Sequence, residues 1–360
     1  MRPTVDRDQR PLVFIWEVTQ ACDLACEHCR ADAQAARHPD ELTTAEGKTL
    51  LEDVSRFGEN QLVVLSGGDP CKRPDLVDLV AHGDDLGLSM SLTPSGTSSL
   101  TGDVLDDLAD AGLRRMALSL DGGDAAAHDR FRGEDGSFAE TLRAAERASE
   151  AGLPLQVNTT VCAQTVEQLP AIRDRVRELG AVLWSVFFLV PVGRGRVLDP
   201  IAPERADAVM DWLADVADEE PFGVKTTEAP HYRRVKLQRR DADPSDDGLQ
   251  RRGGVIAGDG FVFVSHTGEV YPSGFLPKSA GNVREDDPVD VYRESDLFER
   301  LRDRDELGGK CGACEFRHVC GGSRSRAYAH TGDPLAADPL CPYVPDGYEP
   351  TGDGSPAGAD

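Results

Sequence analysis

The stretch "LVFIWEVTQACDLACEHCRA" at residues 12–31 joins an apolar run to three closely spaced cysteines. The run at 12–19 is rich in β-forming residues and predicts a buried strand. Cys22, Cys26 and Cys29 follow at the spacing Cys-x3-Cys-x2-Cys, so their thiols belong to the loop directly after that strand. Closed thiolate metal sites use four ligands, and three leave a coordination position open for catalysis.

Similar apolar runs recur along the chain, at 61–66, 88–94, 115–120, 155–161 and 183–190. Helical stretches lie between them. The stretch 42–58 opens with a capping box of Thr43 and Glu46, and 137–152 ends on Gly152. Strand–helix alternation predicts an α/β fold with a parallel sheet, and continuous apolar runs predict strands covered on both faces. Six units are fewer than the eight of a closed barrel, so we expect an open, partial (β/α)6 parallel barrel.

The pattern changes after residue 200. We expect a barrel core at 1–200, a helical and linker segment at 201–254, a small α+β domain at 255–345 and a disordered tail at 346–360. The second segment contains a predicted helix at 201–221 and a polar, exposed loop at 239–254. In the third, 260–277 predicts a hairpin that turns at Thr267 and Gly268.

The composition excludes several classes of function. The formal net charge is −25, from 64 acidic and 39 basic residues, so the surface repels nucleic acid and anionic membranes. Without a long apolar run or a signal-like N-terminus, the chain is predicted to be cytoplasmic. Its acidic, Lys-poor composition is typical of proteins from salt-loving archaea and predicts a halophilic protein. In a reducing cytoplasm, its nine cysteines indicate metal or redox chemistry rather than disulfides.

Further polar motifs follow the other predicted strands, at the end of a parallel barrel where ligands bind. Each is weak alone, because short Gly- and Asp-containing turns are common. Their order at successive strand ends predicts one continuous site. They occur in "SGGDP" (66–70), "TPSG" (93–96), "SLDGG" (119–123), "NTT" (158–160) and "VPVGRG" (190–195).

The cysteine spacing and these strand-end motifs together resemble the radical S-adenosylmethionine (SAM) superfamily. The resemblance implies a [4Fe–4S] cluster on Cys22, Cys26 and Cys29 whose open iron is chelated by SAM. Reductive cleavage of SAM would give a 5'-deoxyadenosyl radical that takes a hydrogen atom from the substrate. No further catalytic side chain is assigned.

The same resemblance implies which residues contact SAM. Gly67 and Gly68 would bind its amino group through backbone carbonyls, and Asp69 stands where Glu is commoner. His28 holds a position that is usually aromatic. The remaining predicted contacts are to the ribose and the carboxylate: Ser119, Asp121, Asn158 and, for a SAM or substrate carboxylate, Arg194.

A second set of four thiols, Cys311, Cys314, Cys320 and Cys341, leaves no open position. The surrounding "KCGACEFRHVCGGSRSRA" (310–327) resembles the C-terminal SPASM/twitch extension of radical SAM enzymes and implies one auxiliary [4Fe–4S] cluster. The full pattern holds two clusters, but Ser273 and Arg324 stand where it has cysteines. A zinc site is the alternative, because Cys-x2-Cys also suits tetrahedral zinc. Cys71 and Cys162 are given no role, since buried free cysteines are common.

Four stretches (16–33, 155–161, 187–195 and 310–327) resemble the radical SAM branch of the alternative haem pathway, which includes iron-coproporphyrin III decarboxylases. This implies oxidative decarboxylation of porphyrin propionates, with a low-potential electron donor such as ferredoxin. Arginine pairs could bind the substrate carboxylates or form surface ion pairs. His231 and Tyr232 could ligate the haem iron or stack on the macrocycle, or be ordinary loop residues. The arginine pairs are 194/196, 233/234, 239/240, 251/252 and 324/326.

Three other functions remain open from the sequence. The first is a radical SAM/SPASM maturase that modifies a ribosomal peptide or protein. The second is an enzyme of the anaerobic sulfatase-maturing type, disfavoured by the missing cysteines. The third is a non-catalytic iron–sulfur electron carrier, disfavoured by the intact strand-end motifs.

Overall fold

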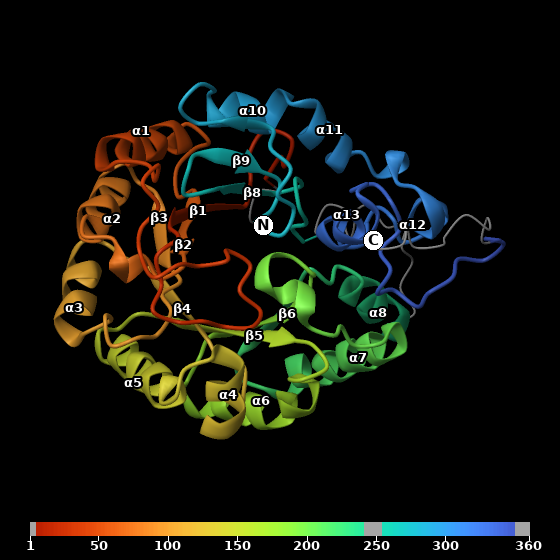
Figure 1. The fold of residues 1–360 in the computed structure, drawn as a ribbon. Coiled ribbons are helices and arrows are strands. Elements are labelled where there is room, and N and C mark those ends of the chain that lie inside the picture. Colours follow the sequence, from red (N-terminus) through yellow and green to blue (C-terminus); the bar gives the residue numbers. More distant parts are fainter. Residues whose placement is uncertain (1–4, 241–253, 350–360) are drawn as a thin grey trace.

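The computed structural model describes residues 5–240 and 254–349. In these ranges ten strands form one sheet, in the order β10-β9-β8-β1-β2-β3-β4-β5-β6-β7 (Figure 1). The six predicted strands are confirmed, and each pairs in parallel with the next. They are β1 (Val13–Thr19), β2 (Leu62–Gly67), β3 (Ser89–Leu92), β4 (Arg115–Ser119), β5 (Leu155–Val161) and β6 (Leu183–Phe188).

Helices that connect these strands cover the outside of the curved sheet (Figure 1). The predicted capping box starts the first of them: the Glu46 amide donates to Thr43 Oγ1 over 3.2 Å, and the Thr43 amide donates to Glu46 Oε2 over 2.7 Å. These helices are α1 (Thr44–Ser55), α2 (Leu76–Asp85), α3 (Gly102–Asp110), α4 (Ala125–Arg132), α5 (Ser137–Glu150) and α6 (Leu169–Glu178).

Two further parallel strands extend the barrel. β7 (Gly223–Thr227) pairs with β6, and β8 (Phe261–Val264) pairs with β1 on the opposite edge. The predicted hairpin is confirmed as β8 and β9 (Glu269–Tyr271), with β10 (Gly281–Asn282) outside it. β7 escaped prediction because its sequence, GVKTT, is short and polar. Since β7 does not pair with β8 within the described residues, the barrel is open, as predicted.

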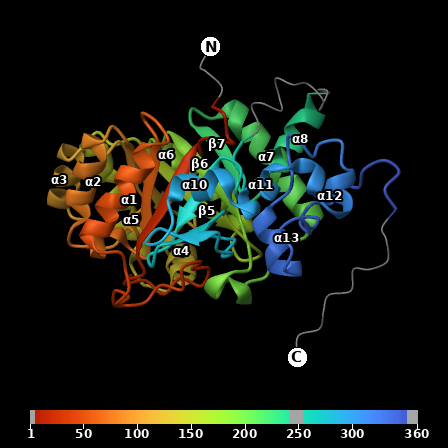
Figure 2. The ribbon, with the colours of Figure 1, turned by 90° about the horizontal axis from the view of Figure 1, so that it is seen from above.

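The C-terminal helices α12 and α13 gather near α7 and α8, away from α1–α3 (Figure 2). The helix predicted at 201–221 is confirmed as α7. The proposed domain boundaries stay a prediction. Strands from the 1–200 segment and from the 255–345 segment belong to the same sheet, so the sheet itself marks no boundary between them. Residues 241–253 of the predicted loop and 350–360 of the predicted tail lie outside the described residues. The helices are α7 (Pro203–Glu219), α8 (Tyr232–Arg239), α10 (Pro288–Glu294), α11 (Asp296–Arg302), α12 (Gly309–Ala313) and α13 (Arg324–Thr331).

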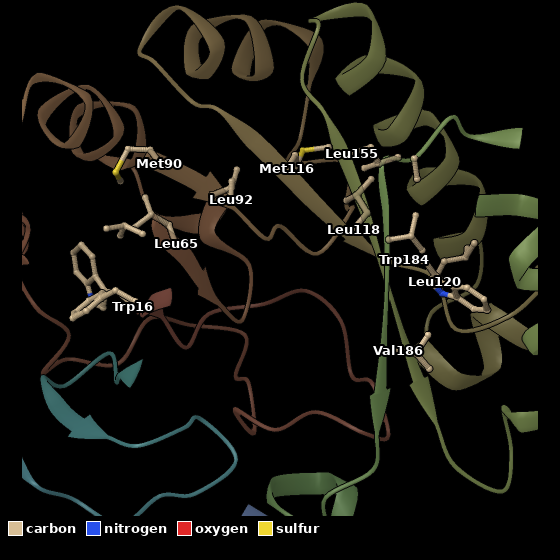
Figure 3. Close-up of a cluster of buried hydrophobic side chains, with 14 of the residues drawn as sticks. Trp16, Leu65, Met90, Leu92, Met116, Leu118, Leu120, Leu155, Trp184 and Val186 are labelled. Carbon is tan, nitrogen blue, oxygen red and sulfur yellow. The ribbon is translucent and has the colours of Figure 1, made fainter. Parts of the chain in front are cut away.

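The two faces of the sheet differ. Buried side chains such as Trp16, Met116 and Trp184 point outward from the strands and pack with the helices (Figure 3). In β5, buried residues alternate with half-buried ones, and the half-buried Gln156 and Asn158 line a cavity inside the barrel. The expectation of strands covered on both faces is therefore wrong for β5, because the open barrel leaves its interior partly empty. None of the described helices has both the length and the apolar character needed to cross a membrane.

Candidate active site

A cavity of about 370 Å³ occupies the inside of the barrel. Inward-facing residues of the strands form its wall, and the loops after the strands form one end of it. Every predicted strand-end motif contributes residues to the cavity wall. Two of the predicted site residues, Asp69 and Asp121, are not among them. The predicted site residues that line it are Cys22, Cys26, Cys29, Gly67, Gly68, Ser119, Asn158 and Arg194.

The three cysteines are free thiols on one loop. The loop is closed by two backbone hydrogen bonds: Cys22 N donates to Gln34 O over 2.7 Å, and Gln34 N to Gln20 O over 3.0 Å. Cys22 Sγ accepts from the Leu24 amide at 3.3 Å, and Cys29 Sγ accepts from the Ala33 amide at 3.4 Å. Such N–H donors stabilise negative charge on sulfur, so the loop suits thiolate ligands.

Burial raises the pKa of the Cys22 and Cys26 thiols. The guanidinium of Arg132 opposes this effect at both positions, and a hydrogen bond with Ser95 Oγ, 3.4 Å from Cys22 Sγ, opposes it at Cys22. Arg132 is itself buried beside the loop. Because burial dominates, the chain alone does not ionise these thiols, and a metal must displace their protons to bind.

Arg194 fixes the cysteine loop in place. Its Nε donates to Cys26 O over 2.9 Å and its Nη1 donates to Ala33 O over 2.9 Å. Its buried Nη2 has no hydrogen-bond partner among the described residues. The predicted carboxylate-binding role of Arg194 is therefore limited to this one nitrogen, since the other two are used by the loop.

Gly67 and Gly68 let the second strand end close to the first. A Cβ atom on Gly67, whose φ is +152°, would lie 2.3 Å from Thr19 O, and one on Gly68 would lie 2.4 Å from Ala21 O. Neither position has room for a side chain, so both glycines are required by close backbone approach. Their exposed backbone forms part of the cavity wall.

Asp69 and Asp121 are buried behind the wall rather than in it. Asp69 accepts hydrogen bonds from Thr97 Oγ1 at 2.8 Å and from the Cys71 amide at 3.2 Å, so it anchors the loop after β3. Asp121 accepts from the Thr160 amide at 2.7 Å and lies 3.5 Å from Arg132. Asp69 therefore holds a loop and Asp121 ties β5 to α4, whereas Ser119 and Asn158 face the cavity.

His28 packs face to face on Phe131, with ring centroids 4.5 Å apart. Burial lowers its pKa to about 4, although Asp121 opposes the shift. The ring is therefore neutral near pH 7 and forms part of the cavity wall beside the cysteines. Its position in the sequence is usually aromatic in the family it resembles, and the stacking shows why an aromatic ring fits there.

The second set of cysteines surrounds a separate small cavity. Cys311, Cys314, Cys320 and Cys341 are all free. The Asp338 amide donates to Cys311 Sγ over 3.4 Å, and the Gly322 amide donates to Cys320 Sγ over 3.5 Å. Three cations also line this cavity and would offset thiolate charge: Arg234, Lys310 and Arg317.

The two positions that depart from the SPASM pattern have other partners. Arg324 is fully buried, and its Nη1 donates to Pro334 O and Ala336 O over 2.9 and 2.8 Å. Ser273 Oγ donates to Glu228 over 3.1 Å at the wall of the main cavity. Glu228, which the sequence did not reveal, also accepts from the hydroxyls of Ser323 and Ser325. Its φ of +54° is strained for a non-glycine residue.

Most of the paired arginines are engaged within the protein. They donate to backbone carbonyls or pair with carboxylates, as at Arg326 with Asp338 over 3.2 Å. His231 and Tyr232 are buried and absent from the cavity wall, so neither faces the space where a ligand could bind. Arg251 and Arg252 lie outside the described residues. The engaged arginines are Arg194, Arg233, Arg234, Arg239, Arg324 and Arg326.

Comparisons with known proteins agree with this geometry. A family model described as the radical SAM superfamily matches residues 16–176. The chain is 39% identical over 341 residues to the AdoMet-dependent heme synthase of Methanosarcina barkeri, which covers 93% of this chain and 97% of that protein. The chain belongs to the radical SAM superfamily. It is also 32% identical over 355 residues to the PqqA peptide cyclase of Bradyrhizobium diazoefficiens, covering 96% of this chain and 89% of that protein.

Solved structures show that the radical SAM fold extends through the C-terminal region. SuiB of Streptococcus suis, bound to its precursor peptide SuiA, matches 93% of this chain and 76% of its own with a TM-score of 0.71. The enzyme anSMEcpe with bound AdoMet matches 91% of this chain and 93% of its own with a TM-score of 0.68. At 18% and 16% identity these matches establish the fold alone.

Membership of the superfamily makes this protein a radical SAM enzyme and implies a [4Fe–4S] cluster and SAM. The residues fit both groups. Three free thiols, of which Cys22 and Cys29 accept from backbone amides, face a large cavity, and Gly67 and Gly68 present backbone that no side chain could cover. Arg132 and Ser95 beside the thiols were missed by sequence reasoning. Ser95 lies within the quoted "TPSG", whereas Arg132 has no motif that marks it.

Proposed function

We propose that this radical SAM enzyme decarboxylates the propionate side chains of iron-coproporphyrin III, as an AdoMet-dependent heme synthase. The observation that carries the proposal is the 39% identity with such a synthase over almost the whole of both chains. Two further proteins of that name, from Oleidesulfovibrio alaskensis and Nitratidesulfovibrio vulgaris, are 39% and 38% identical over 92% of this chain.

Cys22, Cys26 and Cys29 would hold the catalytic cluster, with SAM beside Gly67, Gly68, Ser119 and Asn158. When bound, these groups supply one-electron chemistry that can remove a hydrogen atom from an unactivated carbon. The chain itself orients and protects the site. Arg194 holds the cysteine loop through two carbonyls, and His28, stacked on Phe131, adds an apolar face beside the loop.

The second cysteine set would hold an auxiliary [4Fe–4S] cluster, with electrons supplied from outside by a low-potential donor such as ferredoxin. The four thiols line one small cavity together with Arg234, Lys310 and Arg317, whose positive charges would offset a cluster of thiolates. Four thiolates also suit tetrahedral zinc, so iron and zinc analysis of the purified protein separates the two.

The test uses the purified chain with rebuilt clusters under anaerobic conditions. Reductant, SAM and iron-coproporphyrin III are added, and porphyrin mass is followed together with 5'-deoxyadenosine. We expect stepwise loss of carboxyl groups that matches 5'-deoxyadenosine release and disappears in Cys22→Ala. Unchanged porphyrin with continued SAM cleavage would overturn the proposal and favour a peptide substrate.

Peptide modification is the second candidate function. It is favoured by the 32% identity with a PqqA peptide cyclase, which also spans nearly the whole chain. The higher identity with the heme synthases supports the porphyrin substrate more strongly. A maturase would change the mass of its peptide, and mass analysis of that peptide would show the modification.

A further inference from the structure

Two cations of the barrel have no partner among the described residues. Arg115 and Lys225 both line the main cavity. Neither makes an ion pair or a side-chain hydrogen bond with any residue of 5–240 or 254–349. Both side chains also contact solvent, so they are accessible to a ligand that enters the cavity.

Strand geometry places Arg115 on the inner face of the barrel. Side chains alternate between the two faces of a strand. Met116 and Leu118 of β4 point outward into the hydrophobic core (Figure 3), so Arg115, Ala117 and Ser119 face the cavity. Lys225 lies in the middle of β7, opposite Ser185 of β6, and reaches the same cavity.

The other charged groups of the cavity wall are engaged within the protein at least in part. Arg30 pairs with Glu17 over 2.6 Å, and Arg233 donates to Val319 O over 3.0 Å. Glu228 is occupied by three serine hydroxyls. Arg132 and Arg194 bind the loops at the cysteine end, where each keeps one unpartnered nitrogen. Among the described residues, Arg115 and Lys225 are therefore the wall cations with no internal hydrogen bond or ion pair.

The pair is electrostatically unfavourable without an anion. Desolvation against the cavity wall and the guanidinium of Arg115 together lower the pKa of Lys225 to about 8, although its side chain keeps contact with solvent. Two like charges that repel each other across a cavity weaken the folded state, and a bound carboxylate would relieve both the desolvation and the repulsion. Arginine suits this task because its planar guanidinium binds a carboxylate through two parallel hydrogen bonds.

We propose that Arg115 and Lys225 form a carboxylate-binding subsite at the solvent-exposed part of the cavity, which holds acidic side chains of the substrate away from the cysteine loop. The proposal rests on the proposed function, which supplies a ligand with several carboxylates. The proposal assigns recognition of the substrate carboxylates to one cation on β4 and one on β7. It does not assign that role to the paired arginines that the sequence suggested.

The position of Arg115 also sets the size of the ligand. Arg115 begins β4 and Ser119 ends it beside the site loops, so their backbones are separated by about 13 Å at 3.3 Å per residue. A ligand that meets both the cysteine end and this subsite must therefore be long as well as acidic. A porphyrin with carboxylates around its rim meets both conditions.

The test measures binding without turnover. The cluster-loaded protein is titrated anaerobically with iron-coproporphyrin III in the presence of SAM and without reductant, and the shift of the porphyrin absorption band gives Kd. The variants are Arg115→Gln, Lys225→Gln and their combination, with the charge-retaining Arg115→Lys and Lys225→Arg. Matched controls are Arg130→Gln and Lys48→Gln, which remove cations without printed partners from the outer helices α4 and α1.

We expect each glutamine variant to raise Kd about tenfold, as loss of one charged hydrogen-bonding partner does. The charge-retaining variants and the controls should stay within about threefold of wild type. The tetramethyl ester of the porphyrin should bind wild type and glutamine variants equally. Glutamine variants that bind the acid as tightly as wild type would overturn the subsite alone. A wild-type protein that binds no porphyrin would overturn the proposed function and this subsite's ligand together.

Discussion

Replacing Arg194 tests whether this side chain mainly shapes the cysteine loop or mainly binds a carboxylate. Arg194→Gln removes two charge-assisted hydrogen bonds, to Cys26 O and Ala33 O. Each such bond contributes about 1.5–3 kcal/mol when buried. Because the side chain is 28% exposed, water replaces part of this, and we expect about 2 kcal/mol in total. That destabilises the closed loop on the order of 30-fold.

The assay is the rate at which a chelator removes iron from the reconstituted protein. We expect Arg194→Gln to lose iron from the N-terminal cluster much faster than wild type while its global unfolding changes little, since the loop opens locally. Arg196→Gln is the control, because Arg196 is exposed two residues away. Normal iron retention with weakened SAM binding would refute the loop-clamping role and support a carboxylate contact.

Three further predictions concern stability and metal content. Gly47→Ala should lower the free energy of unfolding by about 1–2 kcal/mol in urea, because its Cβ would lie 2.4 Å from the Trp16 ring, whereas Gly102→Ala, with open space around it, should not. Burial lowers the pKa of His231 to about 3, so below pH 6.5 the unfolded state binds more protons than the folded state, and the free energy of unfolding decreases as the pH is lowered. Between pH 7 and pH 5 the wild type should lose about 2 kcal/mol more of this free energy than His231→Gln. Equal losses in the two proteins would contradict this prediction. Cys314→Ser should remove about half of the iron if two like clusters are present, whereas loss of zinc with all iron retained would contradict the auxiliary cluster.

The sequence predicts the barrel strands well because each is a continuous apolar run between turn signals. β1 to β6 were found this way, and the capping box of α1 appears where Thr43 and Glu46 predict it. β7 was missed because its exposed and half-buried residues give no apolar pattern. It forms a strand only because the edge of β6 offers it backbone partners.

The candidate site divides in the same manner. Spacing alone groups Cys22, Cys26 and Cys29, since three cysteines in one short loop must lie close together in any fold. Sequence also marks Gly67 and Gly68, although only the structure shows the carbonyls that exclude a side chain there. Asp69 and Asp121 occupy motif positions, yet hydrogen bonds hold both carboxylates behind the cavity wall, Asp69 on the loop after β3 and Asp121 on β5.

The sequence by itself determined the features that depend on short stretches of the chain. These are the strand order, the helix caps and the two cysteine sets, and each can be recognised from residues close together in the sequence. The tertiary structure decided which charges are free. Arg115 and Arg326 look alike in the sequence, but folding buries Arg326 against Asp338 and leaves Arg115 facing the cavity without a partner in the described part of the chain. Ion pairing depends on contacts between residues far apart in the chain, and no local pattern records them.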